Sequence, residues 1–465
     1  MATARLNCRR TLGATMIRNR DALPSGTAHE TALDCVAAGI AAAQPERVVR
    51  ESVHVEGTRL DIGDETHDLA EYDAVQVLGG GNAAAHVAGA LEDALGAALD
   101  GGLVVTDDNH ETDTVDVRPA DHPIPSRRGV DSTEAVLDRA ASADADTLVI
   151  AVVTGGGSAC LVAPTDDISL GGLQATTRAL LDCGATIQEI NAVRKHLSTV
   201  KGGQFARTLT PARVSALVLS DVVGDDLDVI ASGPLVPDPT TFGDALDVLA
   251  SYDLTVPDSV RDRLVTGARG GHEETPGPDD AAFDRVDTHV VGSNWTAVDA
   301  AREAATQRGY DTLVLSTRLR GEARNTALTH AAVAEEMVAT GDPVDPPAVV
   351  LSGGETTVTV TGEGRGGPNQ EFALAAGLDL PVEAVLAAVD TDGIDGDTDA
   401  AGALVDGTLV SEHNTAERAL GDNDANAYLT DSGAIIETGP TGTNVNDLHV
   451  LVVGDPDRGD ATVGT

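Results

Sequence analysis

Apolar residues follow two recurring patterns along most of the chain. In one they return every three or four positions, which predicts amphipathic helices; in the other they form short β-branched runs, which predict buried strands. In the first half these patterns predict helices at 27–43, 83–98 and 132–141, and strands at 75–78, 103–105, 147–153 and 215–219. Strands and helices that alternate in this way predict an α/β fold built on a parallel, doubly wound sheet.

The composition changes between residues 264 and 284, where glycine, proline and acidic residues replace the apolar pattern. A second alternating region follows, with predicted strands at 286–291, 311–316 and 348–352, helices at 295–307 and 325–340, and a hairpin-like segment at 356–360. A chain of 465 residues exceeds one ordinary hydrophobic core, so we expect two domains. The predicted division is an N-terminal domain at 16–263, a linker at 264–284 and a smaller C-terminal domain at 285–465.

The beginning of the chain contains no apolar segment of the length that a secretory signal needs. Met16 opens a run, MIRNR, that reads as a natural start, so we expect residues 1–15 to be a non-native extension. Whether Met1 or Met16 is the initiator stays open. The chain has no apolar run of about 18 residues, which predicts no membrane-spanning helix and a cytoplasmic protein.

Charge changes this picture more than any other property. The chain carries 75 acidic against 30 basic residues, a net charge of −45, and its only lysines are Lys195 and Lys201. Scattered acids on a well-patterned chain argue against disorder and against a basic partner, and favour adaptation to high intracellular salt, where charge repulsion is screened. The same negative field disfavours nucleic-acid binding. A homodimer is compatible with the sequence.

The four cysteines, Cys8, Cys35, Cys160 and Cys183, are far apart and have neither the pairing pattern of a disulfide framework nor zinc-site spacing. They are interpreted as small core residues of a reducing compartment.

Two glycine clusters follow predicted strands: Gly79, Gly80 and Gly81 with Asn82, and Gly155, Gly156 and Gly157 with Ser158. Glycine turns at strand ends expose backbone amides to an anion, and the ends of parallel strands are where α/β proteins bind ligands. Glycines also make ordinary tight turns, so either cluster alone would mean little. Together they predict a phosphate site.

The two lysines fall in one seven-residue window, beside Arg194 and His196. In a chain that uses arginine almost everywhere else, a retained lysine indicates a need for a compact ammonium, as in phosphate binding. The alternative is a chance surface position. We predict that Lys195 and Arg194 are catalytic cations and that Lys201 contacts phosphate.

Acidic residues follow two further apolar stretches. Asp221 and Asp225 come after the strand at 215–219, and Asp392 lies in the run DTDGIDGD after a later one. Mg²⁺ prefers one or two carboxylates together with waters and phosphates, so Asp221 and Asp225 are the predicted metal ligands and Asp392 a predicted catalytic group. The second run resembles half of a calcium loop but has Ala401 where the twelfth-position glutamate should stand, which excludes that interpretation.

Three segments of the second half combine glycines with polar side chains: SGGETT, GGPNQE and TGPTGTNVND. Turn chemistry alone could explain one of them. Three in one domain predict a wall of a polar binding site.

Several runs, in matching order over residues 16–452, resemble those of the MOFRL-type glycerate 2-kinases: GGGSACL, EINAVRKHLSTVKGG, LSDVVGDDLDVIASGPLVPD, GGETTVTV, GGPNQEFAL, TDGIDGDTDAAGA and TGPTGTNVND. The resemblance implies a Rossmann-like N-terminal domain, a C-terminal MOFRL domain and an active-site cleft between them. It also implies transfer of phosphate from ATP, with Mg²⁺, to the 2-hydroxyl of D-glycerate. The predicted contacts of this small-molecule substrate are His122, Arg324, Glu355, Asn369, Thr441 and Asn444.

The chain departs from the family pattern at two positions. Asn82 stands where a lysine usually follows the first glycine cluster, and Pro368 stands where many relatives have arginine. These departures leave a kinase for a related sugar acid as an alternative. A second alternative is an NAD(P)-dependent hydroxypyruvate reductase, because Gly79, Gly81 and Ala84 fit a relaxed dinucleotide fingerprint, although Asp107 lies later than usual. A third is a binding protein without catalytic activity.

Overall fold

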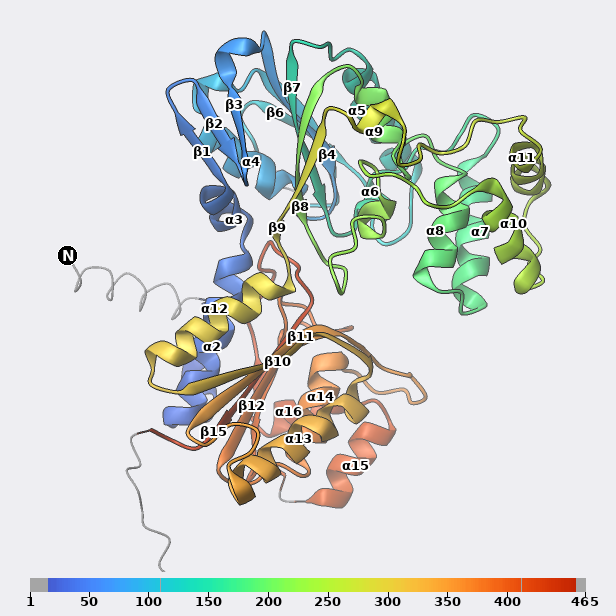
Figure 1. The fold of residues 1–465 in the computed structure, drawn as a ribbon. Coiled ribbons are helices and arrows are strands. Elements are labelled where there is room, and N and C mark those ends of the chain that lie inside the picture. Colours follow the sequence, from blue (N-terminus) through green and yellow to red (C-terminus); the bar gives the residue numbers. More distant parts are fainter. Residues whose placement is uncertain (1–15, 109, 411, 457–465) are drawn as a thin grey trace, which may run out of the picture. The chain divides into compact units, whose positions relative to one another are not determined.

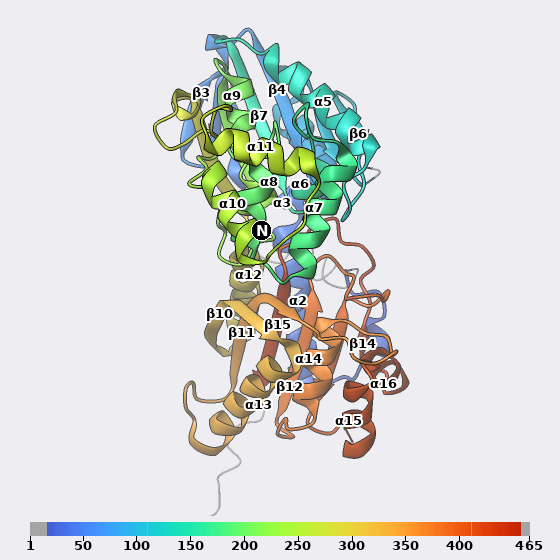
Figure 2. The same cartoon turned by 90° about the vertical axis from the view of Figure 1, so that its right-hand side faces the viewer.

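The computed structural model describes residues 16–108, 110–410 and 412–456. The predicted extension at 1–15, with Cys8, lies outside the described residues. The chain divides into two compact units (Figures 1 and 2). The inserted unit is Pro45–Val291; the outer unit is formed by the segments on either side of it, Met1–Gln44 and Gly292–Thr465. No helix among the described residues is long and apolar enough to cross a membrane.

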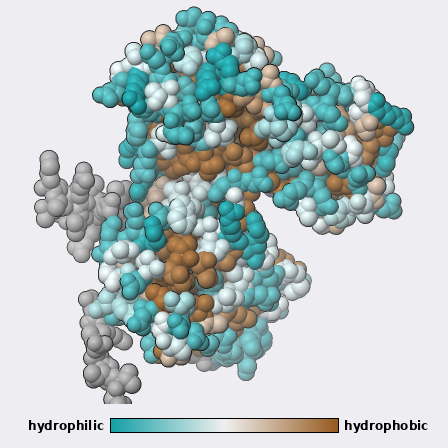
Figure 3. Space-filling view, viewed as in Figure 1, coloured by the Kyte–Doolittle hydropathy of each residue, from teal (hydrophilic) through white to brown (hydrophobic). Residues whose placement is uncertain are grey.

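The surface carries the acidic excess of the sequence. Hydrophilic residues cover much of the face drawn in Figure 3 in each unit, with apolar patches between them. Both lysines are 1% exposed, so the positive charge at the surface comes from arginine.

The inserted unit is built on a six-stranded sheet of order β6-β5-β4-β7-β8-β9, in which the five strands from β6 to β8 pair in parallel. Its elements are α3 (Pro45–Ser52), β1 (Val53–Glu56), β2 (Arg59–Ile62), β3 (Glu65–Asp68), β4 (Ala74–Gly80), α4 (Ala84–Leu95), β5 (Gly101–Thr106), β6 (Val115–Pro119), α5 (Arg127–Ala141), β7 (Thr147–Thr154), α6 (Gly157–Cys160), α7 (Leu170–Asp182), α8 (Ile187–Lys195), α9 (Gln204–Leu209), β8 (Arg213–Leu219), α10 (Phe242–Ser251), α11 (Asp258–Ala268) and β9 (Val286–Gly292).

Both faces of this sheet are buried, which explains why its strands are continuous apolar runs. In β7, Leu148, Ile150 and Val152 pack with α3 and α4, and the alternate residues pack with α5 and α9. Helices α7, α8, α10 and α11 form a separate apolar cluster within this unit (Figure 1). The strand order, numbered along the chain, is 3-2-1-4-5-6, the order of a dinucleotide-binding doubly wound sheet, so the Rossmann-like prediction is confirmed.

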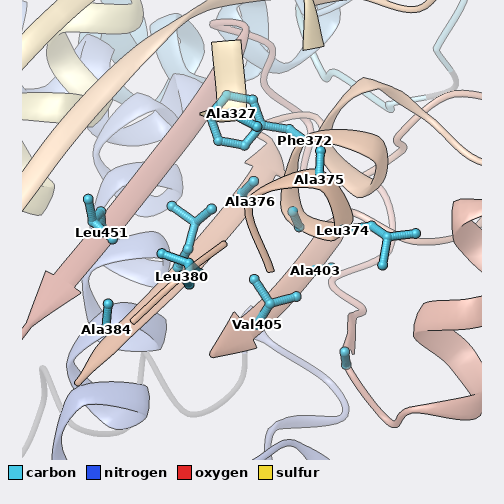
Figure 4. Close-up of a cluster of buried hydrophobic side chains, with 14 of the residues drawn as sticks. Ala327, Phe372, Leu374, Ala375, Ala376, Leu380, Ala384, Ala403, Val405 and Leu451 are labelled. Carbon is cyan, nitrogen blue, oxygen red and sulfur yellow. The ribbon is translucent and has the colours of Figure 1, made fainter. Parts of the chain in front are cut away.

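The outer unit holds a second six-stranded sheet, of order β10-β11-β15-β12-β13-β14, mostly antiparallel. Its elements are α2 (Thr27–Ala43), α12 (Asn294–Gln307), β10 (Asp311–Glu322), α13 (Ala323–Thr340), β11 (Ala348–Thr357), α14 (Pro368–Gly377), β12 (Ala384–Asp390), β13 (Gly402–Asp406), α15 (His413–Gly421), α16 (Ala425–Asp431), β14 (Ile435–Ile436) and β15 (Asp447–Val453). Helices α2 and α12 cover one face. Helices α13 and α14 cover the other, where Phe372, Leu374 and Leu451 share a core (Figure 4).

The boundaries between the two units differ from the predicted domain division at residues 263 and 285. Helix α2 has the predicted bounds 27–43 but packs against β15, β12 and α12, so residues 16–44 belong to the outer unit. The predicted strand at 286–291 is β9, an edge strand of the first sheet and not of the second. The segment at 356–360 contains no hairpin, because β11 runs on to Thr357 and ends there.

The predicted linker at 264–284 is part of the inserted unit. Its start is the end of α11, and Thr275 Oγ1 donates to Asp238 Oδ2 at 2.8 Å. Asp238 N donates to the carbonyl of Pro276 at 2.9 Å, and Arg207 Nη2 donates to Asp280 Oδ2 at 2.6 Å. Glycine and proline here shape a loop that is bound along its length, and composition alone cannot distinguish such a loop from a linker.

Candidate active site

The two glycine turns meet where the order of the first sheet reverses. β4 and β7 are neighbours whose connections leave in opposite directions, and this switch point is where doubly wound sheets bind ligands. Asn82 N donates to the carbonyl of Gly155 at 2.8 Å, and Ala83 N donates to Thr154 Oγ1 at 3.2 Å. Gly81 has φ 136°, and a Cβ there would lie 2.5 Å from the carbonyl oxygen of Thr154. The first turn therefore needs glycine in order to lie against the second.

The amides of the first turn are already used inside the chain. Besides those of Asn82 and Ala83, the amide of Gly81 donates to Val105 O at 2.9 Å and that of Ala84 to Gly81 O at 3.2 Å. These groups would have to bind phosphate in the predicted role of Gly79–Asn82, and also in a dinucleotide fingerprint. The structure therefore argues against both phosphate binding and dinucleotide binding at this turn. The amides of Asn82 and Ala83 instead stabilise the second glycine turn.

The second turn, Gly155–Ser158, has one amide that already binds an anionic oxygen. Gly156, in the left-handed region with φ 71°, donates its N–H to Asp221 Oδ2 at 3.3 Å. Burial raises the pKa of Asp221, an effect that the hydrogen bond from the Gly156 amide and, to a smaller extent, the nearby His122 oppose. The predicted residues Gly156, Asp221 and His122 thus belong to one neighbourhood.

Lys201 supports this turn from within the unit. Its ammonium donates to the carbonyls of Ser158 and Leu161, both at 2.9 Å, and burial lowers its pKa well below the usual value. These bonds fix the short α6. The structure thus gives Lys201 two carbonyl partners of the chain itself where the sequence predicted a phosphate.

A hydroxyl network links the second turn to α8. Ser158 Oγ and Ser232 Oγ are 2.8 Å apart, and Ser232 Oγ donates to Asn191 Oδ1 at 3.0 Å. Arg194 Nη1 donates to Ser232 Oγ at 3.4 Å. Among the described residues no carboxylate pairs with Arg194, and burial lowers its pKa to about 10. An arginine that has no counterion and lies beside a glycine turn can bind an anion.

Lys195, one residue further on, has a different environment. Its ammonium is ion-paired with Asp228 and lies 3.4 Å from Asp238 Oδ1. Thr240 and Thr275 also donate to Asp238. Lys195 is therefore the cation of a buried ion-pair cluster, which is neither of the two positions considered from the sequence, a free phosphate contact or a surface residue.

The geometry gives little support to the prediction that Asp221 and Asp225 are metal ligands. Asp225 sits in the loop after β8 with φ 60°, partly buried, and Asp221 faces the second turn. In the described part of the chain no group of three or more His, Cys, Asp or Glu side chains is arranged to hold a metal ion. Asp221 would supply one carboxylate, which suits Mg²⁺ only where phosphates and waters complete its shell.

In the outer unit, a carboxylate cluster forms where β11, β15 and β12 lie side by side. Asp390 pairs with Asp447 across the sheet, and Asp447 with Gly354 on its other side. Burial raises the pKa of Asp390 well above its usual value, and the neighbouring charge of Asp392 adds to this. Burial also raises the pKa of Asp392 and, to about 7, that of Asp447.

Three predicted residues converge on this cluster. Asn444 Nδ2 donates to Asp392 Oδ2 at 3.4 Å, and Thr441 N donates to the carbonyl of Asp392 at 3.0 Å. Asn369 Nδ2 donates to Asp447 Oδ1 at 2.7 Å and to Asp395 Oδ1 at 3.2 Å. Asn369 follows Pro368, the first residue of α14, so the N-terminus of this helix is anchored on the carboxylates.

Arg324 and Glu355 lie outside this group of contacts. Arg324 is ion-paired with Glu371 and donates to the carbonyl of Leu420 at 3.2 Å, so its charge is neutralised within the unit. Glu355 is exposed on β11. The contacts of Arg324 with Glu371 and Leu420 therefore do not bring it to the carboxylates.

Sequence reasoning missed four residues of these two sites: Asn191, Ser232, Asp390 and Asp447. Asn191, Ser232 and Asp447 lie inside runs that carry the family resemblance, and Asp390 directly precedes such a run. Asp390 and Asp447 stand at strand ends, a signal that was available. Asn191 and Ser232 are 41 residues apart, and only the fold shows that they touch.

A Rossmann-like unit with two glycine turns at its switch point, inserted into a second α/β unit with a carboxylate cluster, is the architecture of a two-domain α/β enzyme. The family described as "Domain of unknown function (DUF4147)" matches residues 31–265, and the MOFRL family matches residues 348–447. The chain belongs to the type-2 glycerate kinase family defined by these two domains.

Its relatives include the glycerate 2-kinase of Pyrococcus horikoshii, 39% identical over 91% of this chain and 97% of the relative. The D-glycerate 2-kinase of Thermotoga maritima is likewise 39% identical, with the same two coverages. The crystal structure of the Thermotoga maritima glycerate kinase matches with a TM-score of 0.81 at 37% identity, covering 91% of this chain and 99% of that one.

Proposed function

We propose that the protein transfers the terminal phosphate of ATP to the 2-hydroxyl of D-glycerate, giving 2-phosphoglycerate. The relatives named glycerate 2-kinase support the reaction. Phosphoryl transfer needs positioning and charge neutralisation more than covalent chemistry, and the two sites provide both kinds of group.

The observation that carries the proposal is the position of Arg194. In a chain with 75 acidic residues, this guanidinium has no carboxylate partner among the described residues and reaches Ser232, one hydroxyl away from Ser158. A guanidinium binds phosphate oxygens through two parallel N–H groups and stays charged at all working pH values. We assign to Arg194 the role of stabilising negative charge on the transferring phosphoryl group.

The residues at the switch point fit a nucleotide phosphate. The proposal is supported by the turn at Gly155–Ser158, where the Gly156 amide faces a carboxylate oxygen, Asp221 Oδ2, at 3.3 Å. Mg²⁺, when bound, would neutralise charge on the phosphates. Asp221 is the residue that would hold it, and Asp225 the second candidate on the same loop.

The outer unit supplies groups that move a proton. Asp392 is oriented by Asn444 and by the amide of Ile394, which donates to Asp392 Oδ1 at 2.7 Å. Asp390 beside it binds a proton more readily than a free carboxylate, since burial raises its pKa. We assign to Asp392 the acceptance of the 2-hydroxyl proton, and to Thr441 and Asn369 the support of this carboxylate cluster.

A coupled assay with ATP, Mg²⁺ and D-glycerate in molar KCl tests the proposal, and phosphorus NMR identifies the product. Formation of 2-phosphoglycerate supports it. ADP release with another hydroxy acid, and none with D-glycerate, would replace the substrate. No ADP release with any hydroxy acid would remove the kinase function.

Hydroxypyruvate reduction is the second candidate, because two relatives from Agrobacterium vitis are named putative hydroxypyruvate reductase, one 39% identical over 81% of this chain. The occupied amides of the first glycine turn weigh against a bound dinucleotide. Loss of NADH absorbance that depends on hydroxypyruvate would favour this function instead.

A further inference from the structure

Ser232 holds an unusual backbone conformation. It belongs to three consecutive residues in the left-handed region: Ala231 with φ 50°, Ser232 with φ 64° and Gly233 with φ 62°. Only the last is glycine, so the first two are strained, and strain of this kind persists where the surroundings demand it. Gly202 N donates to Ser232 O at 2.9 Å and Gly203 N to Gly233 O at 2.7 Å, which holds the turn in place.

The Asn191 amide directs its Oδ1 at Ser232, whose hydroxyl donates to it at 3.0 Å. A serine hydroxyl donates one proton and accepts at two lone pairs. The proton of Ser232 goes to Asn191 Oδ1, so its oxygen accepts from Ser158 Oγ and from Arg194 Nη1. With its oxygen directed at Ser232, Asn191 turns its Nδ2 away from the hydroxyl.

The Nδ2 of Asn191 has no acceptor. Asn191 is 2% exposed, and its Nδ2 is buried and donates to no group in the part of the chain that the structure describes. A buried donor without a partner is costly, and native proteins keep few of them. Asn191 and Arg194 lie one helical turn apart on α8 and share Ser232 as a neighbour, so two donors without an anionic partner occur on one face of this helix.

We propose that Asn191 is a ligand of a substrate oxyanion, which it binds through Nδ2 beside Arg194, and that Ser232 is the positioning residue that orients it. The ligand oxygen belongs either to a phosphate of the nucleotide or to the carboxylate of the hydroxy acid, which share this chemistry. The inference deepens the proposed function and rests on it only for the identity of the anion.

Binding to the full chain tests the inference with three separate probes: inorganic phosphate, ADP and D-glycerate, by titration calorimetry in molar KCl. Asn191→Asp keeps the shape of the side chain but places a carboxylate where Nδ2 was. A hydrogen bond to a charged group corresponds to about 10- to 100-fold in affinity, so at least a tenfold loss is expected for the anion that Asn191 contacts. Loss for phosphate and ADP alone assigns the nucleotide, and loss for D-glycerate alone assigns the carboxylate.

Ser232→Gly provides a second variant that leaves the backbone relaxed, because glycine accepts the left-handed conformation. Relief of the strain offsets part of the stability lost with the three hydrogen bonds of the hydroxyl, and the variant should weaken the same probe several-fold, since the amide is no longer oriented. Ala231→Gly is the matched control: it relieves the neighbouring strain without removing a polar group, and should bind every probe as the wild type does.

Unchanged affinity of Asn191→Asp for all three probes, in a folded protein, overturns the inference. Equal weakening by Ser232→Gly and Ala231→Gly overturns the role of Ser232. A wild-type chain that binds these anions without turnover removes the proposed kinase function and leaves this inference standing, so the two failures are distinguishable.

Discussion

The ammonium of Lys195 lies 3.4 Å from Asp238 Oδ1, and both side chains are buried in the inserted unit. The same ammonium is paired with Asp228, whose carboxylate is partly exposed. Lys195 thus compensates the charge of two acids, of which Asp238 is shielded from water. The ion-pair cluster explains why Lys195 is retained in a chain almost without lysine, and we propose the phosphate-facing role for Arg194, its neighbour on α8.

Lys195→Met is expected to destabilise the protein. Removing one partner of a buried pair leaves the other charge uncompensated, which typically costs about 3–5 kcal/mol. The double variant Lys195→Met/Asp238→Asn should recover part of this loss because it removes one of the stranded charges. Urea unfolding in molar KCl measures both variants.

Lys201→Met is the matched control, since Lys201 is the other buried lysine and donates to carbonyls rather than to carboxylates. Its loss should not be recovered by Asp238→Asn. A Lys195→Met protein with an unchanged unfolding curve and a 100-fold lower kcat would return the catalytic role to Lys195.

Arg194→Met is expected to lower kcat by on the order of 10²–10³-fold, the usual loss when one preorganised contact to a transition state is removed. The unfolding free energy should change little, because no described carboxylate is left unpaired. Steady-state kinetics with ATP and D-glycerate measure kcat and KM. Arg207→Met serves as the control, because Arg207 is ion-paired with Asp280, and it should affect stability rather than kcat. Equal kcat for the Arg194 variant and the wild type would contradict the assignment.

The sequence predicted best what depends on local pattern. The bounds of α2 and the strand β7 follow from helical spacing and from a run of β-branched residues. The partner of α2 could not be predicted, because an apolar helix face does not specify which sheet will cover it. The candidate site shows the same limit. Gly155–Ser158 and Asp392 were visible as motifs, whereas Asn191 could not be singled out, because its partner Ser232 is 41 residues away.

Stability is expected to rise with salt. The chain has a net charge of −45, and the repulsion among its acidic side chains acts over about 10 Å at 0.1 M salt but over only about 3 Å at 1 M. Thermal unfolding in increasing KCl should therefore show a rising midpoint, and kinase activity should follow it. Sucrose at matched osmolality is the control, because it is excluded from protein surfaces without screening charge. A midpoint that is unchanged between low and molar KCl would refute the adaptation to high salt.

Asp447 should make the protein less stable as the pH rises from about 4 to about 7. Burial raises the pKa of Asp447 to about 7, although hydrogen bonds from Thr356 and Asn369 oppose this shift. In the unfolded chain an aspartate has a pKa of about 3.9. Between these values the folded chain binds the proton more tightly than the unfolded chain does. The contribution is therefore complete below about pH 4 and is lost as the pH rises through 7, with a total on the order of 4 kcal/mol.

Asp447→Asn, measured by urea unfolding at pH 5, 6, 7 and 8 in constant molar KCl, should flatten this dependence. Asp61→Asn is the control, because the pKa of this exposed carboxylate is lowered by its hydrogen bond from Thr66 and its titration falls below the tested range. If Asp447→Asn keeps the wild-type slope from pH 5 to 7, the proton that the folded protein holds belongs to another carboxylate of the cluster.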